Sequence, residues 1–136
     1  MLPVKQYFAN AVGTVDFVPD AFVHLHWSGQ PLTSPELRAL YVHTRNLLLR
    51  HDMHCILADH RAMPTSPDTA DCDWLLGQWL PQTVAQTRYS HCAVLPAPDP
   101  TNRLHTDSVV RNMRRYLALS IFNDLDQAAE WLTRGN

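Results

Sequence analysis

Residues 21–27 alternate between two faces with a period of two. In the segment 21–27, Phe22, His24 and His26 fall on one face, while the opposite face is continuously apolar. This alternation is typical of a strand with one buried face and one half-exposed face. Three short strands are predicted in this part of the chain, over residues 4–8, 14–18 and 21–27.

Apolar residues then recur three and four positions apart, which predicts helices. The first helix begins at Ser34, where Ser34 can cap, Pro35 suits the first helical position and Glu36 stabilises the positive end of the dipole. The triplet 66–68 repeats this Ser-Pro-acidic device, so Ser66 is interpreted as the N-cap of the second helix.

The second helix carries a proline inside its apolar stripe. The ring of Pro81 would crowd the carbonyl of residue 77, which is a glycine, so we expect a bend at this point. Two further helices are expected near the C-terminus, the third capped by Thr106 or Asp107 and the last capped by Asn123.

Unbroken apolar runs separate these helices. The runs 55–58 and 91–95 are typical of central strands covered on both faces, and 117–122 is predicted to be the last strand. The order of elements is then β-β-β-α-β-α-β-α-β-α. Strands that alternate with helices favour a largely parallel sheet behind an antiparallel N-terminal meander. We therefore expect one α/β domain over residues 1–136, with a mixed sheet and four helices.

Composition narrows the function classes. The net charge of −2 argues against a general nucleic-acid binder, which needs a basic face. No stretch approaches the roughly 20 apolar residues that span a bilayer. The three cysteines, Cys55, Cys72 and Cys92, include no CxxC pair, which favours reduced thiols in a cytoplasmic protein.

Motifs for catalysis, metals and cofactors are missing from the sequence. There is no GxSxG elbow for a nucleophile and no phosphate-cradling glycine loop, so neither an enzyme nor a bound cofactor is expected. Eight histidines raise the question of a metal, but neither HExxH nor zinc-type spacing occurs. His24 and His26 are instead interpreted as marking a half-exposed sheet face.

Several strings along the chain together resemble a known group of small bacterial proteins. The strings are His24–Trp27, Ile56–Arg61, Trp74–Pro81, Ala93–Pro96 and Phe122–Leu132. In combination they resemble uncharacterised proteins of STAS-like fold, the fold of anti-sigma-factor antagonists and of small lipid-carrier (CRAL-TRIO) domains. The resemblance implies a five-stranded mixed sheet with helices packed against it, and a binding role rather than chemistry.

Anti-sigma-factor antagonists carry a phosphorylated serine in an Asp-Ser-Ser/Thr-Gly motif at the start of the helix after the central strand. Phosphorylation there blocks partner binding through the added negative charge. That motif is absent here, although Ser66 in the segment 64–69 occupies about the corresponding place. Whether Ser66 is ever phosphorylated is left open, and its N-cap role is preferred.

Asp59 and Arg61 are the first candidates for ligand or partner binding. They leave the carboxyl end of a core strand, where open α/β sheets bind ligands. In the functional interpretation Arg61 supplies a donor fork to an anion or polar ligand. In the structural interpretation, which we prefer, Asp59 fixes the loop and Arg61 pairs with a neighbouring carboxylate.

Trp74 lies at the edge of its apolar stripe and is a candidate for an exposed binding residue.

Taken together, the sequence favours a non-enzymatic binding or regulatory module with a protein partner. The alternative is a small carrier whose helices open over an apolar pocket for a lipid or other apolar ligand. A homodimer through the sheet face with less helical cover is left open. A carrier should contain an apolar cavity of at least about 300 Å³, the low end for ligand pockets.

Overall fold

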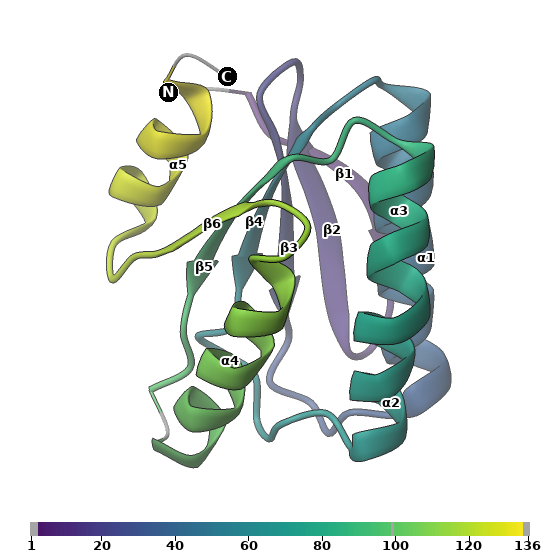
Figure 1. Cartoon of the computed structure of the whole chain (residues 1–136), viewed down its shortest axis with the longest axis vertical. Helices are drawn as coiled ribbons and strands as arrows, with labels where there is room; N and C mark the ends of the chain where they lie inside the picture. Colours follow the sequence, from purple (N-terminus) through teal and green to yellow (C-terminus); the bar gives the residue numbers. More distant parts are fainter. Residues whose placement is uncertain (1–2, 99, 135–136) are drawn as a thin grey trace.

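The computed structural model describes residues 3–98 and 100–134, and for residues 100–106 it describes the backbone only. Strands and helices follow one another in the order expected from the sequence (Figure 1). The strands are β1 (Lys5–Ala9), β2 (Gly13–Val18), β3 (Phe22–Trp27), β4 (Cys55–Asp59), β5 (His91–Leu95) and β6 (Ala118–Ile121). The helical elements are α1 (Ser34–Arg50), α2 (Thr69–Trp74), the π-helical turn η1 (Leu75–Trp79), α3 (Leu80–Gln86), α4 (Pro100–Met113) and α5 (Leu125–Thr133).

The sheet is mixed, and its strands lie side by side in chain order from β1 to β6. β1, β2 and β3 form the antiparallel meander, and the pairs from β3 to β6 are parallel. The two apolar runs of the sequence are neighbours as expected, with Cys55 opposite His91 and Asp59 opposite Leu95. The resemblance implied five strands, and this number is wrong because β1 pairs along β2 and adds a sixth.

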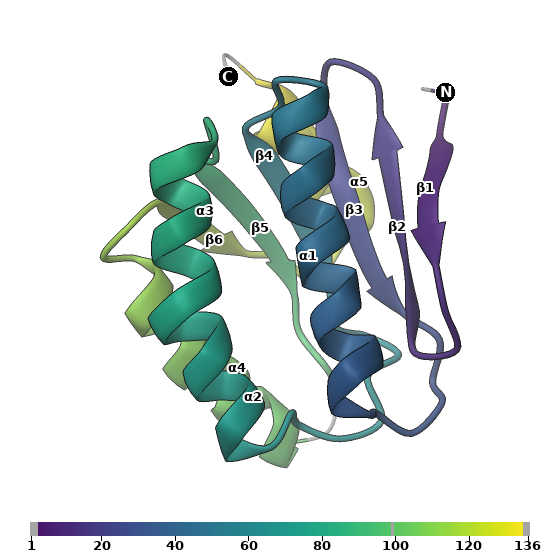
Figure 2. The ribbon, with the colours of Figure 1, turned by 90° about the vertical axis from the view of Figure 1, so that its right-hand side faces the viewer.

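The four helical segments of the described chain are divided unequally between the two faces of the sheet. Each parallel pair is joined by one helical segment, and successive right-handed crossovers in one direction place such segments on the same face. Accordingly α1, α2–η1–α3 and α4 pack on one face, and α5 alone packs on the other (Figures 1 and 2). We call the two sides the three-helix face and the α5 face.

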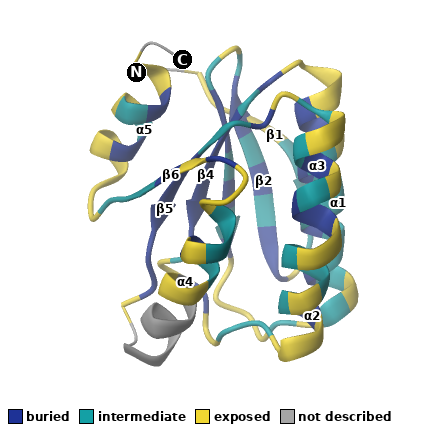
Figure 3. Ribbon diagram, viewed as in Figure 1, coloured by how far each residue is buried: buried dark blue, intermediate teal, exposed yellow. Residues whose placement is uncertain are grey.

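Two apolar cores result, one on each face of the sheet. The larger core lies on the three-helix face, where Leu40 and Leu47 of α1 and Trp79 of η1 pack with the side chains of the strands. The smaller core packs Ala128 and Leu132 of α5 against the strands. In Figure 3 β4 and β5 are buried along nearly their whole length, as central strands covered on both sides should be.

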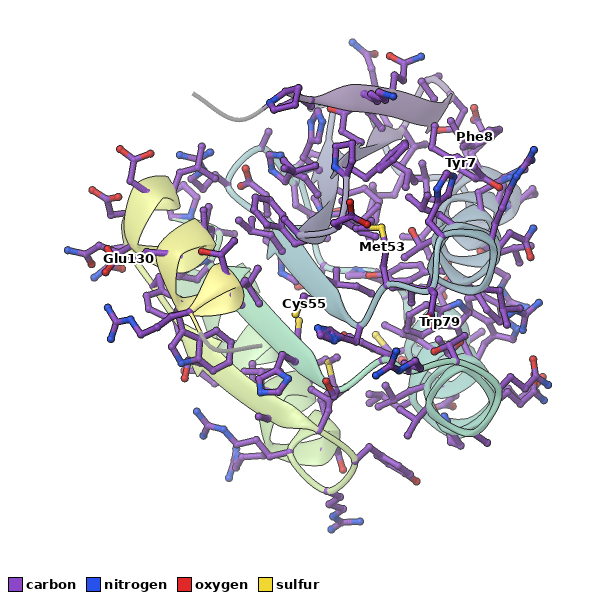
Figure 4. All side chains as sticks on the ribbon, turned by 90° about the horizontal axis from the view of Figure 1, so that it is seen from above. Tyr7, Phe8, Met53, Cys55, Trp79 and Glu130 are labelled. Carbon is purple, nitrogen blue, oxygen red and sulfur yellow. The ribbon has the colours of Figure 1, made fainter. Side chains whose placement is uncertain are left out.

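Figure 4, a view from above, separates the two cores by their labelled side chains. Cys55 belongs to the α5 face, where its thiol donates to the carbonyl oxygen of Leu132 at 3.6 Å. Trp79 lies on the three-helix face, and its indole N–H donates to the carbonyl oxygen of Tyr41 at 2.6 Å. The indole bond ties the π-helical turn to α1.

The proline that was expected to bend the second helix instead accompanies a π-helical turn. The turn η1 precedes α3, and the backbone N–H of Leu80 bonds to the carbonyl of Leu75, five residues back. A wider turn relieves the crowding between the ring of Pro81 and the carbonyl of Gly77, because the regular i−4 spacing is interrupted there. The structure therefore has a widened helical turn where a bend was expected.

Helix starts were predicted less accurately than helices. The N-cap of α1 is Thr33 rather than Ser34, and Ser34 instead donates to Asp71 at 2.7 Å. The N-cap of α2 is Asp68, whose carboxylate accepts from the backbone N–H of Asp71 at 2.8 Å, so the capping role expected of Ser66 is wrong.

The last two helices also begin at residues other than those expected. α4 begins at Pro100, so Thr106 and Asp107 lie within the helix rather than at its cap. Asp124, not Asn123, caps α5 through the N–H of Gln127. In each case a neighbouring residue of equal capping propensity, or a proline suited to the first turn, occupies the start.

No helix within the described residues is both long enough and apolar enough to cross a membrane.

Candidate functional site

Asp59 and Arg61, the two candidates at the end of β4, are in direct contact. One carboxylate oxygen of Asp59 accepts from the backbone N–H of Arg61 at 3.2 Å and from its Nε at 2.9 Å. The other accepts from Nη2 of Arg61 at 2.8 Å. The carboxylate therefore fixes the loop and holds the guanidinium side-on, which is the geometry of the structural interpretation.

His24 completes the shell of donors around this carboxylate. Its Nε2 lies 3.1 Å from Oδ2 of Asp59, which is only 6% exposed. Burial alone would raise the pKa of Asp59, but the hydrogen bonds from His24 and Arg61 outweigh it and hold the pKa well below its usual range. The hydrogen bond to Asp59 in turn raises the pKa of Arg61. Asp59 is thus an ionised, fully engaged acceptor.

A second histidine–carboxylate pair lies beside the first. Nε2 of His26 is 2.8 Å from Oδ2 of Asp16, and the His24 and His26 rings are 4.6 Å apart. These side chains belong to the part of the α5 face formed by β2, β3 and the end of β4, and we call Asp16, His24, His26 and Asp59 the polar half-face. Both histidines are half-buried, as their alternation in the sequence indicated.

Asp16 was not singled out from the sequence. The signal was present, because Asp16 alternates with the buried Val15 and Phe17 in β2 and therefore shares a face with the half-buried Thr14. What the sequence lacked was the register, which sets β2 against β3 with Asp16 opposite His24. Only the pairing of strands reveals that the acidic and imidazole groups meet.

Arg61 separates two open hollows at the carboxyl end of the parallel strands. Its side chain is half exposed, whereas Asp59 beneath it is buried. One hollow, of about 320 Å³, is lined by Arg61 together with Pro96, Pro98 and Phe122. The other, of about 360 Å³, is lined by Arg61 with His26, Trp27, Asp59 and Ala62. Open α/β sheets bind ligands at the carboxyl ends of their strands where the strand order reverses, and β3 to β6 lie in chain order without such a reversal.

Ser66 and Trp74 lie on the other side of the sheet from the polar half-face. Ser66 is half-buried in the loop before α2 and borders an apolar pocket on the three-helix face. Trp74 is also half-buried, with its ring edge-on to Tyr41 at 6.4 Å and with Arg38 5.1 Å above it. The structure therefore brings Asp59 and Arg61 together, but it does not join Ser66 or Trp74 to them.

The apolar pocket lies between the sheet and the helices of the three-helix face. Its volume is about 60 Å³. The sheet contributes Ala58 and Val94, η1 contributes Leu76 and Trp79, and α4 contributes Met113. Sulfur and aromatic groups also contribute to the lining, through Met63, Cys72, Cys92, Tyr41 and Tyr89. The pocket thus adjoins the π-helical turn, an irregularity that is frequent at functional sites.

Burial disfavours the charged forms of the thiol and phenol groups that border the pocket. Burial raises the pKa of the Cys92 thiol to about 11, and it also raises the pKa of the Tyr41 and Tyr89 hydroxyls. These thiol and phenol groups are therefore uncharged at neutral pH. Within the described residues, no group of three or more His, Cys, Asp or Glu side chains is arranged to hold a metal ion.

Comparison of the chain with protein-family models, with curated protein sequences and with solved structures finds no match.

Proposed function

We propose that this chain is a non-enzymatic binding module of STAS-like fold, and that it holds a compact apolar ligand in the pocket beneath η1. The observation that carries the proposal is the pocket itself, which lies between the sheet and three helical segments and is lined mainly by apolar side chains. Pockets of this kind, with few polar groups, are the usual sites for apolar ligands.

The energetic cost of an empty void supports a ligand. Unfilled volume sealed inside a core costs about 24 cal/mol per Å³, so about 1.4 kcal/mol is the upper limit for a pocket of about 60 Å³ that is partly open. A larger residue in place of Ala58, which lines the pocket from β4, would remove much of that volume. A void maintained beside a widened helical turn is more readily explained by an occupant than by packing alone.

The size of the pocket restricts the ligand. About 60 Å³ is well below the roughly 300 Å³ at the low end of pockets for drug-sized ligands. The site therefore suits a molecule of a few carbon atoms, and a long lipid chain would require α2–η1–α3 to move away from the sheet. The pocket therefore does not reach the volume of at least about 300 Å³ that was expected of a carrier for lipids, and the proposal is limited to compact apolar ligands.

The reactive side chains support a non-enzymatic role. Burial raises the pKa of the Cys55 and Cys92 thiols to about 11, which disfavours the nucleophilic thiolate. His24 and His26 are each hydrogen-bonded to a carboxylate on the polar half-face, away from the apolar pocket. A cytoplasmic location, inferred from cysteine usage, remains part of the proposal.

A regulatory module that docks a protein partner is the second candidate. The observation in its favour is the small volume of the pocket, because a docking module should have a solidly packed interior. The surface then available for a partner lies around Arg61, whose side chain is 50% exposed. Ser66 and Trp74 are less exposed than Arg61. Native mass spectrometry of the purified protein separates the candidates, since it reports a bound small molecule and the number of subunits together.

The test of the ligand site adds isobutane, a compact probe, to the protein and follows the protein signals in ¹H–¹⁵N spectra. Decanoate, which is too long for the pocket, is the comparison probe. Isobutane should shift the indole N–H signal of Trp79, and Ala58→Val should abolish the shift by filling the pocket. Ala9→Val is the matched control, because Ala9 is exposed in β1 and gains the same strand propensity. An unchanged Trp79 signal, or an equal response in folded Ala58→Val, would refute the ligand site.

A further inference from the structure

The guanidinium of Arg61 is only partly used by the contacts that hold it. Asp59 occupies Nε and Nη2, which form the side-on edge of the planar group. In the part of the chain that the structure describes, no further acceptor bonds to this guanidinium. Since a guanidinium carries five N–H groups, the end-on edge of Nη1 and Nη2 retains a parallel pair of donors.

Contacts with Asp59 fix the position of the Arg61 guanidinium. Asp59 is buried, and it is itself held by His24 from β3 and by the backbone N–H of Arg61. The guanidinium therefore does not need to be ordered by a ligand, which reduces the entropic cost of binding. Its side chain is half exposed, and it borders both hollows at the carboxyl end of the strands.

From this geometry we infer a second binding site, for the carboxylate group of a small organic acid with an apolar body. The planar carboxylate matches the two parallel donors of the end-on edge. The apolar body rests in the hollow lined by Pro96, Pro98 and Phe122. The volume of that hollow, about 320 Å³, lies at the low end of pockets for small molecules, which favours a small acid over a protein segment.

Charge selects the carboxylate over a phosphate. Asp59 already balances the charge of Arg61, and Asp16 lies on the same polar half-face, so the site offers donors with little excess positive charge. A carboxylate adds one negative charge to this environment, whereas a phosphate monoester adds nearly two. The site is also independent of the apolar pocket on the three-helix face, because the two share none of their lining residues.

The experiment titrates the full chain at pH 7 with 3-phenylpropionate and follows the backbone amides of Arg61, Ala62 and Ala97 and the Nε–H of Arg61. Three comparison ligands dissect the contacts: 3-phenylpropionamide lacks the charge, acetate lacks the apolar body, and phenyl phosphate carries the larger charge. We expect 3-phenylpropionate to bind at least about tenfold more tightly than each of them.

Two variants and one control locate the site. Arg61→Lys keeps the charge but loses the planar fork, and it should weaken binding about tenfold. Asn123→Tyr fills the hollow from its exposed rim and leaves Asp59 and Arg61 themselves unchanged, and it should weaken binding at least as strongly. Arg88→Lys, at an exposed arginine that pairs with Asp52, should bind as the wild type does.

Three results would overturn the inference. They are equal affinity for the amide and the acid, tighter binding of phenyl phosphate, and unchanged binding in folded Arg61→Lys and Asn123→Tyr.

Discussion

Replacing Asp59 by Asn tests the physical account of the polar half-face most severely. The buried carboxylate accepts four hydrogen bonds, three from Arg61 and one from His24. Asparagine keeps one acceptor oxygen and turns an NH₂ group toward donors, so at least one charge-assisted bond is lost and buried donors face each other. A hydrogen bond to a charged group contributes about 1.5–3 kcal/mol, and we expect a loss of about 2–3 kcal/mol in the free energy of unfolding.

The pH dependence adds an independent signature. The pKa of Asp59 is depressed in the folded state, so its stabilising contribution is present above the unfolded pKa of about 3.9 and is lost as the pH falls toward the folded value. At pH 5 Asp59 is ionised in both the folded and the unfolded chain, so its own contribution to the stability difference between wild type and Asp59→Asn should be complete there. Below about pH 4 it should shrink, because the wild-type carboxylate then becomes protonated more readily in the unfolded chain.

Urea denaturation followed by tryptophan fluorescence at several pH values measures both effects. Asp16→Asn is the control, because Asp16 accepts from one histidine at a more exposed position and should cost under about 1 kcal/mol. A loss below about 0.5 kcal/mol for Asp59→Asn would contradict the account. So would a difference between wild type and variant that remains constant down to pH 3.

Two matched pairs of substitutions test the packing. Gly77→Ala should stabilise the protein by about 0.5–1 kcal/mol, since a Cβ there meets nothing within 4 Å, whereas Gly13→Ala should destabilise it because its Cβ would lie 2.5 Å from the carbonyl oxygen of His26. Thr83→Val should be neutral or stabilising by up to about 1 kcal/mol, because the buried hydroxyl of Thr83 has no partner among the described residues. Thr44→Val should lose stability instead, as its hydroxyl donates to Leu40 at 2.8 Å. Chemical denaturation ranks all four variants, and a reversed order within either pair would refute the packing argument.

Periodicity in the sequence predicted the elements well where one physical pattern dominated. The apolar runs became the neighbouring strands β4 and β5, and the alternation around His24 and His26 became a sheet with one half-buried polar side. The distortion near Pro81 was predicted because a proline inside a helix has a definite steric consequence. These features depend on local sequence alone.

Features that depend on choosing between similar neighbours were predicted poorly. Ser66 and Asp68 both have the side chains of an N-cap, and only the path of the loop decided in favour of Asp68. The number of strands was taken from the resemblance and was too low by one, although the segment 4–8 had the alternation of a strand.

The candidate site was half visible in the sequence. Asp59 and Arg61 are two residues apart, so their contact could be foreseen. The partners His24 and Asp16 come from other strands, and only the strand register brings them to this carboxylate or beside it. The apolar pocket could not be located, because it depends on how the side chains of η1, α4 and the sheet fill the space between them.

The central claim is that the pocket beneath η1 accepts a compact apolar guest, and a crystal of the protein pressurised with xenon tests it most directly. The account predicts a xenon atom between Ala58, Leu76 and Trp79, absent from crystals of the Ala58→Val variant. Continuous side-chain packing at this position, with no xenon in the wild-type crystal, would contradict the claim.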